Sequence, residues 1–213
     1  MTIICDLWFL EIRDARFSPW DNNQRGSPIF STEIRLIAKV SLYHLEDEIS
    51  HGDELDLLCI TCDSQLENIR LALMRQGVIK VTAEILALIV HRKWEANTQM
   101  FARRSIADAA ALLRSRIEEM DALPFLSQAL ERGLVASLLK CEASLTSAVQ
   151  PSARQEPILL LAEVLPGYSV YRSVLHQLTL AVDSAIAQGL DAKLSKSGGF
   201  CVAWKRLKDA VDE

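Results

Sequence analysis

The sequence lacks most of the motifs by which an enzyme or a nucleic-acid-binding protein is identified. It contains no GxGxxG or GxxxxGK[ST] segment for phosphate, and no GxSxG or HExxH motif. Three of its four histidines, His44, His91 and His176, are isolated, without a second metal ligand at helical spacing. The formal net charge of −5 gives no overall attraction to a phosphate backbone. We therefore expect no catalytic residues, no metal ligands and no nucleic-acid partner.

Aromatic side chains are also scarce, and this bears on the fold. Only 6% of the residues are Phe, Trp or Tyr although 50% are hydrophobic, so most apolar volume comes from Leu, Ala, Ile and Val. A β-sandwich would use more aromatic and β-branched residues than this, whereas helices packed on helices do not need them. The composition therefore predicts an all-α protein.

No apolar run is long enough for a membrane span. The run Val81–Val90 contains Glu84, is flanked by Lys80 and by His91–Lys93, and is about half as long as a bilayer requires. The opening MTIICDLWFLEIRD has no basic leader before its apolar residues. We expect neither a signal peptide nor a membrane anchor, and no membrane partner.

The five cysteines are too few and too irregularly spaced for a disulfide framework. Reduced thiols predict an intracellular protein, cytoplasmic or nuclear. Cys59 and Cys62 form a CxxC just before a predicted helix, where amide donors lower a thiol pKa as a redox dithiol requires. No second Cys or His pair stands at a zinc spacing, so we favour structural cysteines, with a thiol redox protein as the alternative.

Helical spacing of apolar residues begins after residue 62 and continues to the end. Ser64 and Glu67 have the spacing of a capping box, and Gly77 is expected to end that helix in a left-handed conformation. Ser105 and Asp108 repeat the capping signal and predict another helix start. The apolar stripe that follows consists of Ile106, Ala109, Ala110, Leu113, Ile117 and Met120.

An internal sequence similarity suggests repeated helical hairpins. LALMRQGVIKVTAEILALI at 71–89 resembles SQALERGLVASLLKCEASL at 127–145, with the glycines 56 residues apart (133 − 77). Gly189 lies at the same offset, although its surroundings match poorly. From the first pair we expect an armadillo- or HEAT-like stack of helical hairpins with an irregular N-terminal segment.

The chain is expected to divide into four parts. SAVQPSARQEP has the composition of a linker between two helical regions. The predicted parts are an irregular segment 1–62 packed on the helical core, a helical-repeat-like region 63–146, the linker 147–157, and C-terminal helices 158–213 of the same domain. The last region contains three predicted helices, Ile158–Leu165, Ser169–Gln188 and Phe200–Val211, the last burying Phe200, Trp204, Leu207 and Val211 on one face.

Two polar stretches near the N-terminus have structural interpretations. The acidic run Glu46–Asp56, which includes His51, is expected to be a solvated connection. RDARFSPWDNNQRGSPIFST at 13–32 combines turn-forming residues with aromatic rings, which predicts a tied loop. We expect Phe17 and Trp20 to contact the helical core and count Arg25 among the candidate interaction residues; a binding loop is the alternative.

Several of these blocks resemble a known family. RDARFSPWDNNQRGSPIFST, DELDLLCI, LLLAEVLPGYSVYRSVLHQL and the ending AWKRLKDAVDE resemble MYND-type zinc-finger proteins of mushroom-forming fungi, in the region N-terminal to the finger. The string Leu165–Val174 is its most specific part and adds Tyr168, Tyr171 and Arg172 to the candidate interaction residues, together with Trp204. The resemblance implies a two-zinc Cys/His cluster after such a region. No Cys/His cluster follows Trp204, so no zinc ligand is carried over and zinc is expected only with a downstream finger.

These observations predict a non-enzymatic helical scaffold without a cofactor, whose partner is a protein or peptide lying on the stacked helices. Two alternatives stay open: the redox protein centred on Cys59 and Cys62, and a truncated family member without activity. The identity of the partner and the oligomeric state do not follow from the sequence.

Overall fold

The computed structural model describes residues 74, 77–95, 99–118, 122–145 and 152–212. Within these residues every regular element is a helix, so the predicted all-α fold is confirmed there. The chain divides into two units between Gln76 and Gly77, and every described residue except Met74 belongs to the second unit. The expectations for segment 1–62 lie outside the described residues; they concern Phe17, Trp20, Arg25, His51, Cys59 and Cys62.

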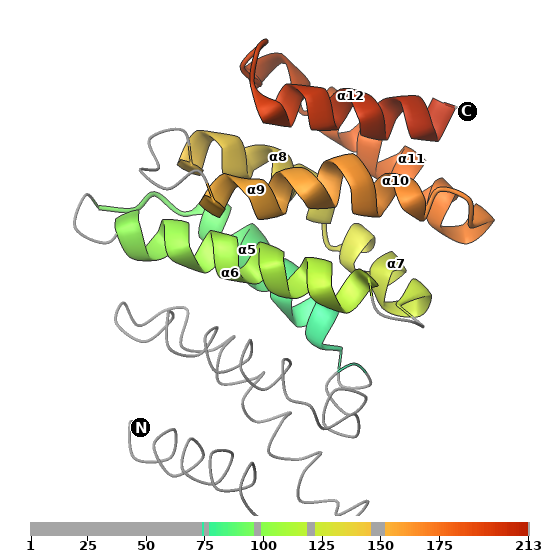
Figure 1. Ribbon diagram of the computed structural model, residues 1–213, viewed down its shortest axis with the longest axis horizontal. Coiled ribbons are helices and arrows are strands. Elements are labelled where there is room, and N and C mark those ends of the chain that lie inside the picture. Colours follow the sequence, from blue (N-terminus) through green and yellow to red (C-terminus); the bar gives the residue numbers. More distant parts are fainter. Residues whose placement is uncertain (1–73, 75–76, 96–98, 119–121, 146–151, 213) are drawn as a thin grey trace, which may run out of the picture. The chain divides into compact units, whose positions relative to one another are not determined.

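The described part of the second unit is a succession of helices (Figure 1). In chain order the elements are α5 (Val78–His91), α6 (Gln99–Glu118), α7 (Leu123–Glu131), α8 (Leu134–Leu145), α9 (Ser152–Leu159), the π-helical turn η3 (Leu160–Val164), α10 (Leu165–Gly167), α11 (Arg172–Ala187), the 3₁₀ turn η4 (Asp191–Lys193) and α12 (Gly199–Asp212).

The helices surround a core of aliphatic residues. Helix α5 packs on α6, α7 and α8, while α9 packs on α6 and α8. Helix α12 packs on η3, and α11 packs on α7 and α8. The apolar stripe predicted for α6 is confirmed, because its described members are fully buried: Ile106, Ala109, Ala110, Leu113 and Ile117.

The predicted C-terminal helices correspond to observed ones, with shifted bounds. Phe200, Trp204 and Leu207 of α12 are buried, as the spacing predicted, whereas Val211, the fourth residue predicted for this face, is only half-buried. Because these residues recur every three or four positions, they form one face of the helix. Exposed Lys205 and Arg206 lie on the opposite face.

Two predicted boundaries are wrong. Helix α6 begins at Gln99, so Ser105 is a buried residue inside the helix rather than its start, and Asp108 pairs with Arg104 one turn earlier. Helix α9 begins at Ser152, inside the predicted linker 147–157. The composition of 147–157 suggested a linker because proline cannot donate a main-chain hydrogen bond within a helix. In the structure Pro157 nevertheless lies inside α9, and a π-helical turn follows α9.

The glycines of the similar segments share one backbone conformation. Gly77, Gly133 and Gly189 have φ of 83°, 81° and 62°, the left-handed region in which a side chain is strained. The left-handed conformation predicted for Gly77 is thus confirmed, while the capping box of Ser64 and Glu67 lies outside the described residues. Gly77 precedes α5 and Gly133 precedes α8, but Gly189 precedes only the short η4. The armadillo- or HEAT-like stacking of the hairpins stays a prediction.

Candidate functional site

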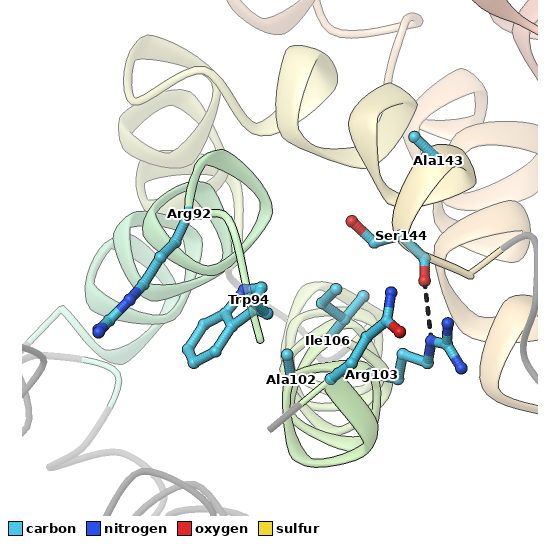
Figure 2. Close-up of a pocket in the computed structure, with 8 residues that line it drawn as sticks. Arg92, Trp94, Ala102, Arg103, Ile106, Ala143 and Ser144 are labelled. Atoms are coloured by element: carbon cyan, nitrogen blue, oxygen red, sulfur yellow. Dashed lines mark hydrogen bonds between the residues drawn. The ribbon is translucent and has the colours of Figure 1, made fainter. Parts of the chain in front are cut away.

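A cavity of about 190 Å³ opens where the end of α5, the start of α6 and the end of α8 meet (Figure 2). Its walls are contributed by two helices, α6 and α8, and by the segment after α5. The lining residues are Arg92, Trp94, Gln99, Ala102, Arg103, Ile106, Ala143 and Ser144.

Trp94 forms one wall of this pocket and is fixed from two sides. Helix α5 ends at His91 because Arg92 turns to an extended conformation, which carries the chain across the helix end. The indole Nε1 of Trp94 donates a hydrogen bond of 2.8 Å to the carbonyl oxygen of Ile89. The guanidinium carbon of Arg92 lies 5.0 Å from the centre of the indole ring, a cation–π contact. The aromatic wall is therefore preformed.

Arg103 joins two of the helices that build the pocket. Its Nε donates a hydrogen bond of 3.1 Å to the carbonyl oxygen of Ser144, drawn as a dashed line in Figure 2. Carbonyls in the last turn of a helix lack partners within the helix and carry the negative end of its dipole, which a guanidinium complements. Ala102 and Ile106 are buried beside Arg103 on α6. The pocket thus has an apolar wall and a cationic one.

The lining of the pocket combines basic, apolar and uncharged polar side chains. Two arginines face this pocket and no carboxylate lines it, although the whole chain carries a formal charge of −5. Among these residues Ser144 has the one hydroxyl, and neither a histidine nor an acid stands beside it as a base. An apolar group flanked by negative charge fits this arrangement.

A basic pair lies next to the pocket. Nζ of Lys140, on α8, is 2.9 Å from Nε2 of His91, the last residue of α5. Burial lowers the pKa of Lys140, and repulsion from Lys193 on η4 lowers it further.

The sequence-predicted residues that the structure describes lie elsewhere. Tyr168 and Tyr171 form a tilted ring pair, 6.0 Å between centroids, at the turn between α10 and α11. The Tyr168 hydroxyl donates to the carbonyl oxygen of Ile117, and burial raises the pKa of that phenol, with Tyr171 and Glu118 adding to the rise. Tyr171 and Arg172 are exposed. None of these residues lines the pocket.

Trp204 is a core residue. It is 3% exposed, and Nζ of Lys208 lies 5.8 Å from its ring centre. Within the described part of the chain its indole N–H has no hydrogen-bond acceptor. Burial and packing explain its position, so we place it in the core rather than among surface contacts.

Among the described cysteines, Cys141 is not a nucleophile candidate. It is fully buried in α8, and its Sγ donates to the carbonyl oxygen of Ser137 at 3.2 Å. Burial strongly raises the pKa of this thiol, which disfavours the reactive thiolate. Within the same described residues, no group of three His, Cys, Asp or Glu side chains is placed to hold a metal ion. No described helix is both long and apolar enough to cross a bilayer.

Sequence reasoning missed the residues that form the pocket. Trp94, Arg103 and Ser144 belong to different helices or turns, and no local motif links them. The available signal was the pair of basic doublets Arg92–Lys93 and Arg103–Arg104, which looks scattered until the α5–α6 hairpin brings its ends together.

Comparisons with known proteins do not identify the chain. No protein-family model matches it, and the searches of curated proteins and of solved structures give no match either. We therefore infer the function from the pocket and its surroundings.

Proposed function

We propose that this protein is a non-enzymatic helical interaction scaffold, and that it binds a peptide segment of a partner protein at the Trp94 pocket. The observation that carries the proposal is the preformed cavity of about 190 Å³, with an anchored indole and two arginines in its lining. Preorganised aromatic walls favour binding because the side chain loses little conformational freedom when the ligand arrives.

The size of the cavity favours a single side chain over a cofactor or metabolite. Small-molecule sites usually enclose roughly 300 to 1,000 Å³. A cavity of about 150 Å³ is known to accept benzene. At about 190 Å³ the Trp94 pocket has room for one apolar or aromatic side chain, with the rest of the peptide lying outside.

Charge identifies the kind of peptide. Arg92 and Arg103 are among the lining residues, so acidic residues on either side of the inserted side chain would complement their charge. The proposed ligand is therefore an apolar residue flanked by Asp, Glu or another anionic group.

The test is peptide selection followed by a matched pair of substitutions. Random peptides displayed on phage are selected on the full chain, and the affinity of the best ones is measured by calorimetry. Ala143 is an exposed residue of the pocket lining, and Ala143→Trp would cover the opening without changing the core. Ala187→Trp places the same ring at an exposed position of α11.

We expect Ala143→Trp to weaken binding by about tenfold or more, since burying one apolar side chain contributes roughly 1.5 to 3 kcal/mol. Ala187→Trp should bind as the wild type does. If no acidic, apolar peptide is selected, or if both variants bind equally well, the proposed function is wrong.

We also propose that the chain is related to the MYND-type zinc-finger proteins, which rests on the Leu165–Val174 string and the other resembling blocks. The test is the genomic sequence after codon 213. An in-frame Cys/His cluster is expected there, and an open frame without one would contradict the placement of this region before a finger.

A further inference from the structure

Two basic side chains from separate helices, His91 and Lys140, are in contact beside the pocket, and Lys193 is near enough to repel Lys140. His91 ends α5, Lys140 lies in α8, and Lys193 ends η4. Nζ of Lys140 is 2.9 Å from Nε2 of His91 and 3.5 Å from its Nδ1. An ammonium group donates to a ring nitrogen that carries no proton, and such a bond would hold Lys140 and His91 together.

The acidic side chains nearest along the chain are directed at main-chain amides. Oε2 of Glu142 accepts a hydrogen bond of 3.2 Å from the amide of Ser195. Oδ1 of Asp191 accepts one of 2.9 Å from the amide of Ala192, at the start of η4. Lys140 therefore contacts a histidine from α5, and its pKa is lowered by burial and, further, by repulsion from Lys193 of η4.

This cluster adjoins the Trp94 pocket. His91 immediately precedes Arg92 of the pocket lining. Lys140 precedes Ala143 and Ser144 by one helical turn, so it lies on the same side of α8 as these two lining residues. A peptide with one side chain in the pocket would place a residue a few positions away over Lys140.

We propose that His91, Lys140 and Lys193 form an anion site that binds a phosphate group on the peptide, next to the residue that enters the Trp94 pocket. This inference rests on the proposed function for the peptide, but the anion site stands on its own geometry. Lysine and histidine are point donors that surround a tetrahedral phosphate, whereas a planar carboxylate is matched best by the fork of an arginine. Bound phosphate would also offset the repulsion between Lys140 and Lys193.

The site is tested first with inorganic phosphate alone. Carbon–proton correlation spectra of the full chain are recorded during titrations with phosphate and, at equal ionic strength, with acetate. We expect saturable shifts of the His91 ring and the Lys140 side chain with phosphate and only weak ones with acetate. Lys140→Gln should abolish saturation, while Lys205→Gln, on the exposed face of α12, should leave it intact.

The second arm uses a selected peptide synthesised with serine, glutamate or phosphoserine at each position flanking the apolar residue. We expect phosphoserine at one position to bind about tenfold more tightly than serine, through one to three charge-assisted hydrogen bonds. Lys140→Gln should remove that gain and leave the affinity for the serine peptide unchanged.

The outcomes separate the two proposals. Equal gains from glutamate and phosphoserine, or unsaturable shifts with phosphate, would overturn the phosphate site while leaving peptide binding in place. Saturable phosphate binding together with equal peptide affinity of Ala143→Trp and Ala187→Trp would instead overturn peptide binding at the pocket. Retention of the phosphoserine gain in Lys140→Gln would show that the cluster does not bind the phosphate.

Discussion

The two ends of α6 carry arginines that meet very different partners. Arg103 and Arg114 are eleven residues apart (114 − 103), about three turns, and so lie on the same face. At the C-terminal end, Nε of Arg114 bonds Oε2 of Glu156 at 2.6 Å and its Nη1 bonds Glu118 at 3.0 Å. At the N-terminal end, Nε of Arg103 bonds the Ser144 carbonyl beside the pocket.

Arginine thus has a structural role at one end of the helix and, in the proposed function, a binding role at the other. The hydrogen bond to Glu156 raises the pKa of Arg114, with the charges of Glu156 and Glu118 contributing, and closes the seam between α6 and α9. Around Arg103 the packing leaves a cavity lined by a second arginine and no acid. The closed end should therefore respond to mutation in stability, and the open end in ligand affinity.

The largest effect should come from the core that supports both ends. Leu113 of α6 is fully buried, so Leu113→Ala leaves a cavity and should lower the free energy of unfolding by about 3 kcal/mol, measured by urea denaturation. Leu180→Ala, at a position 51% exposed on α11, is the matched control and should change it by less than about 0.5 kcal/mol. Similar losses in both variants would contradict the assigned core.

The closed end is tested by removing the interhelical carboxylate. Glu156→Ala deprives Arg114 of its partner on α9, and the expected loss is about 1.5 kcal/mol in the same assay, the size of a hydrogen bond to a charged group. Asp108→Ala, which breaks an exposed pair within α6, should cost only about 0.4 kcal/mol. If the Arg114–Glu156 pair between α6 and α9 is solvated in solution, Glu156→Ala and Asp108→Ala should lower the free energy of unfolding by similar amounts.

A smaller effect is expected at the tyrosines of the same end. Tyr168→Phe removes the hydroxyl that donates to Ile117 and leaves that carbonyl without the bond, at a cost of about 1 kcal/mol. Tyr171→Phe alters an exposed ring and should be close to neutral. Thermal unfolding of the two variants measures the difference, and an equal response would remove the role assigned to the Tyr168 hydroxyl.

The smallest effect, and the one with the opposite sign, belongs to Lys140 beside the open end. Its pKa in the folded protein is below the usual 10.5, so the unfolded chain binds more protons between the two values and stability rises with pH there. At neutral pH the charged Lys140 thus opposes folding, and Lys140→Gln should raise Tm slightly. The gain should shrink as the pH approaches 10.5; a gain that stays constant would exclude titration of Lys140 as its source.

The sequence predicted the buried faces of the helices better than the positions of the helix ends. Apolar spacing identified the buried face of α6 and of α12, because a helix must turn the same side to the core at every turn. It failed at Ser105 and at Ser152, where local composition indicated a helix start and a linker. Packing against neighbouring helices outweighs such local preferences, and a single sequence does not display that packing.

The pocket could not be predicted for a related reason. Arg103 and Ser144 are 41 positions apart, and their contact exists only because the start of α6 lies beside the end of α8. The residues singled out by family resemblance were unusual in composition, and the two described examples with assigned contacts, Tyr168 and Trp204, have structural roles. Unusual side chains mark positions under constraint, but they do not distinguish packing from binding.

Peptide binding at the Trp94 pocket can be followed through the indole N–H signals of Trp94 and Trp204 during titration with a selected peptide, in nitrogen–proton correlation spectra. Trp94 lines the pocket, whereas Trp204 is buried in α12 and serves as an internal reference. We predict a large, saturable shift of the Trp94 signal with little change at Trp204. An unchanged Trp94 signal at saturating peptide would show that the peptide binds elsewhere.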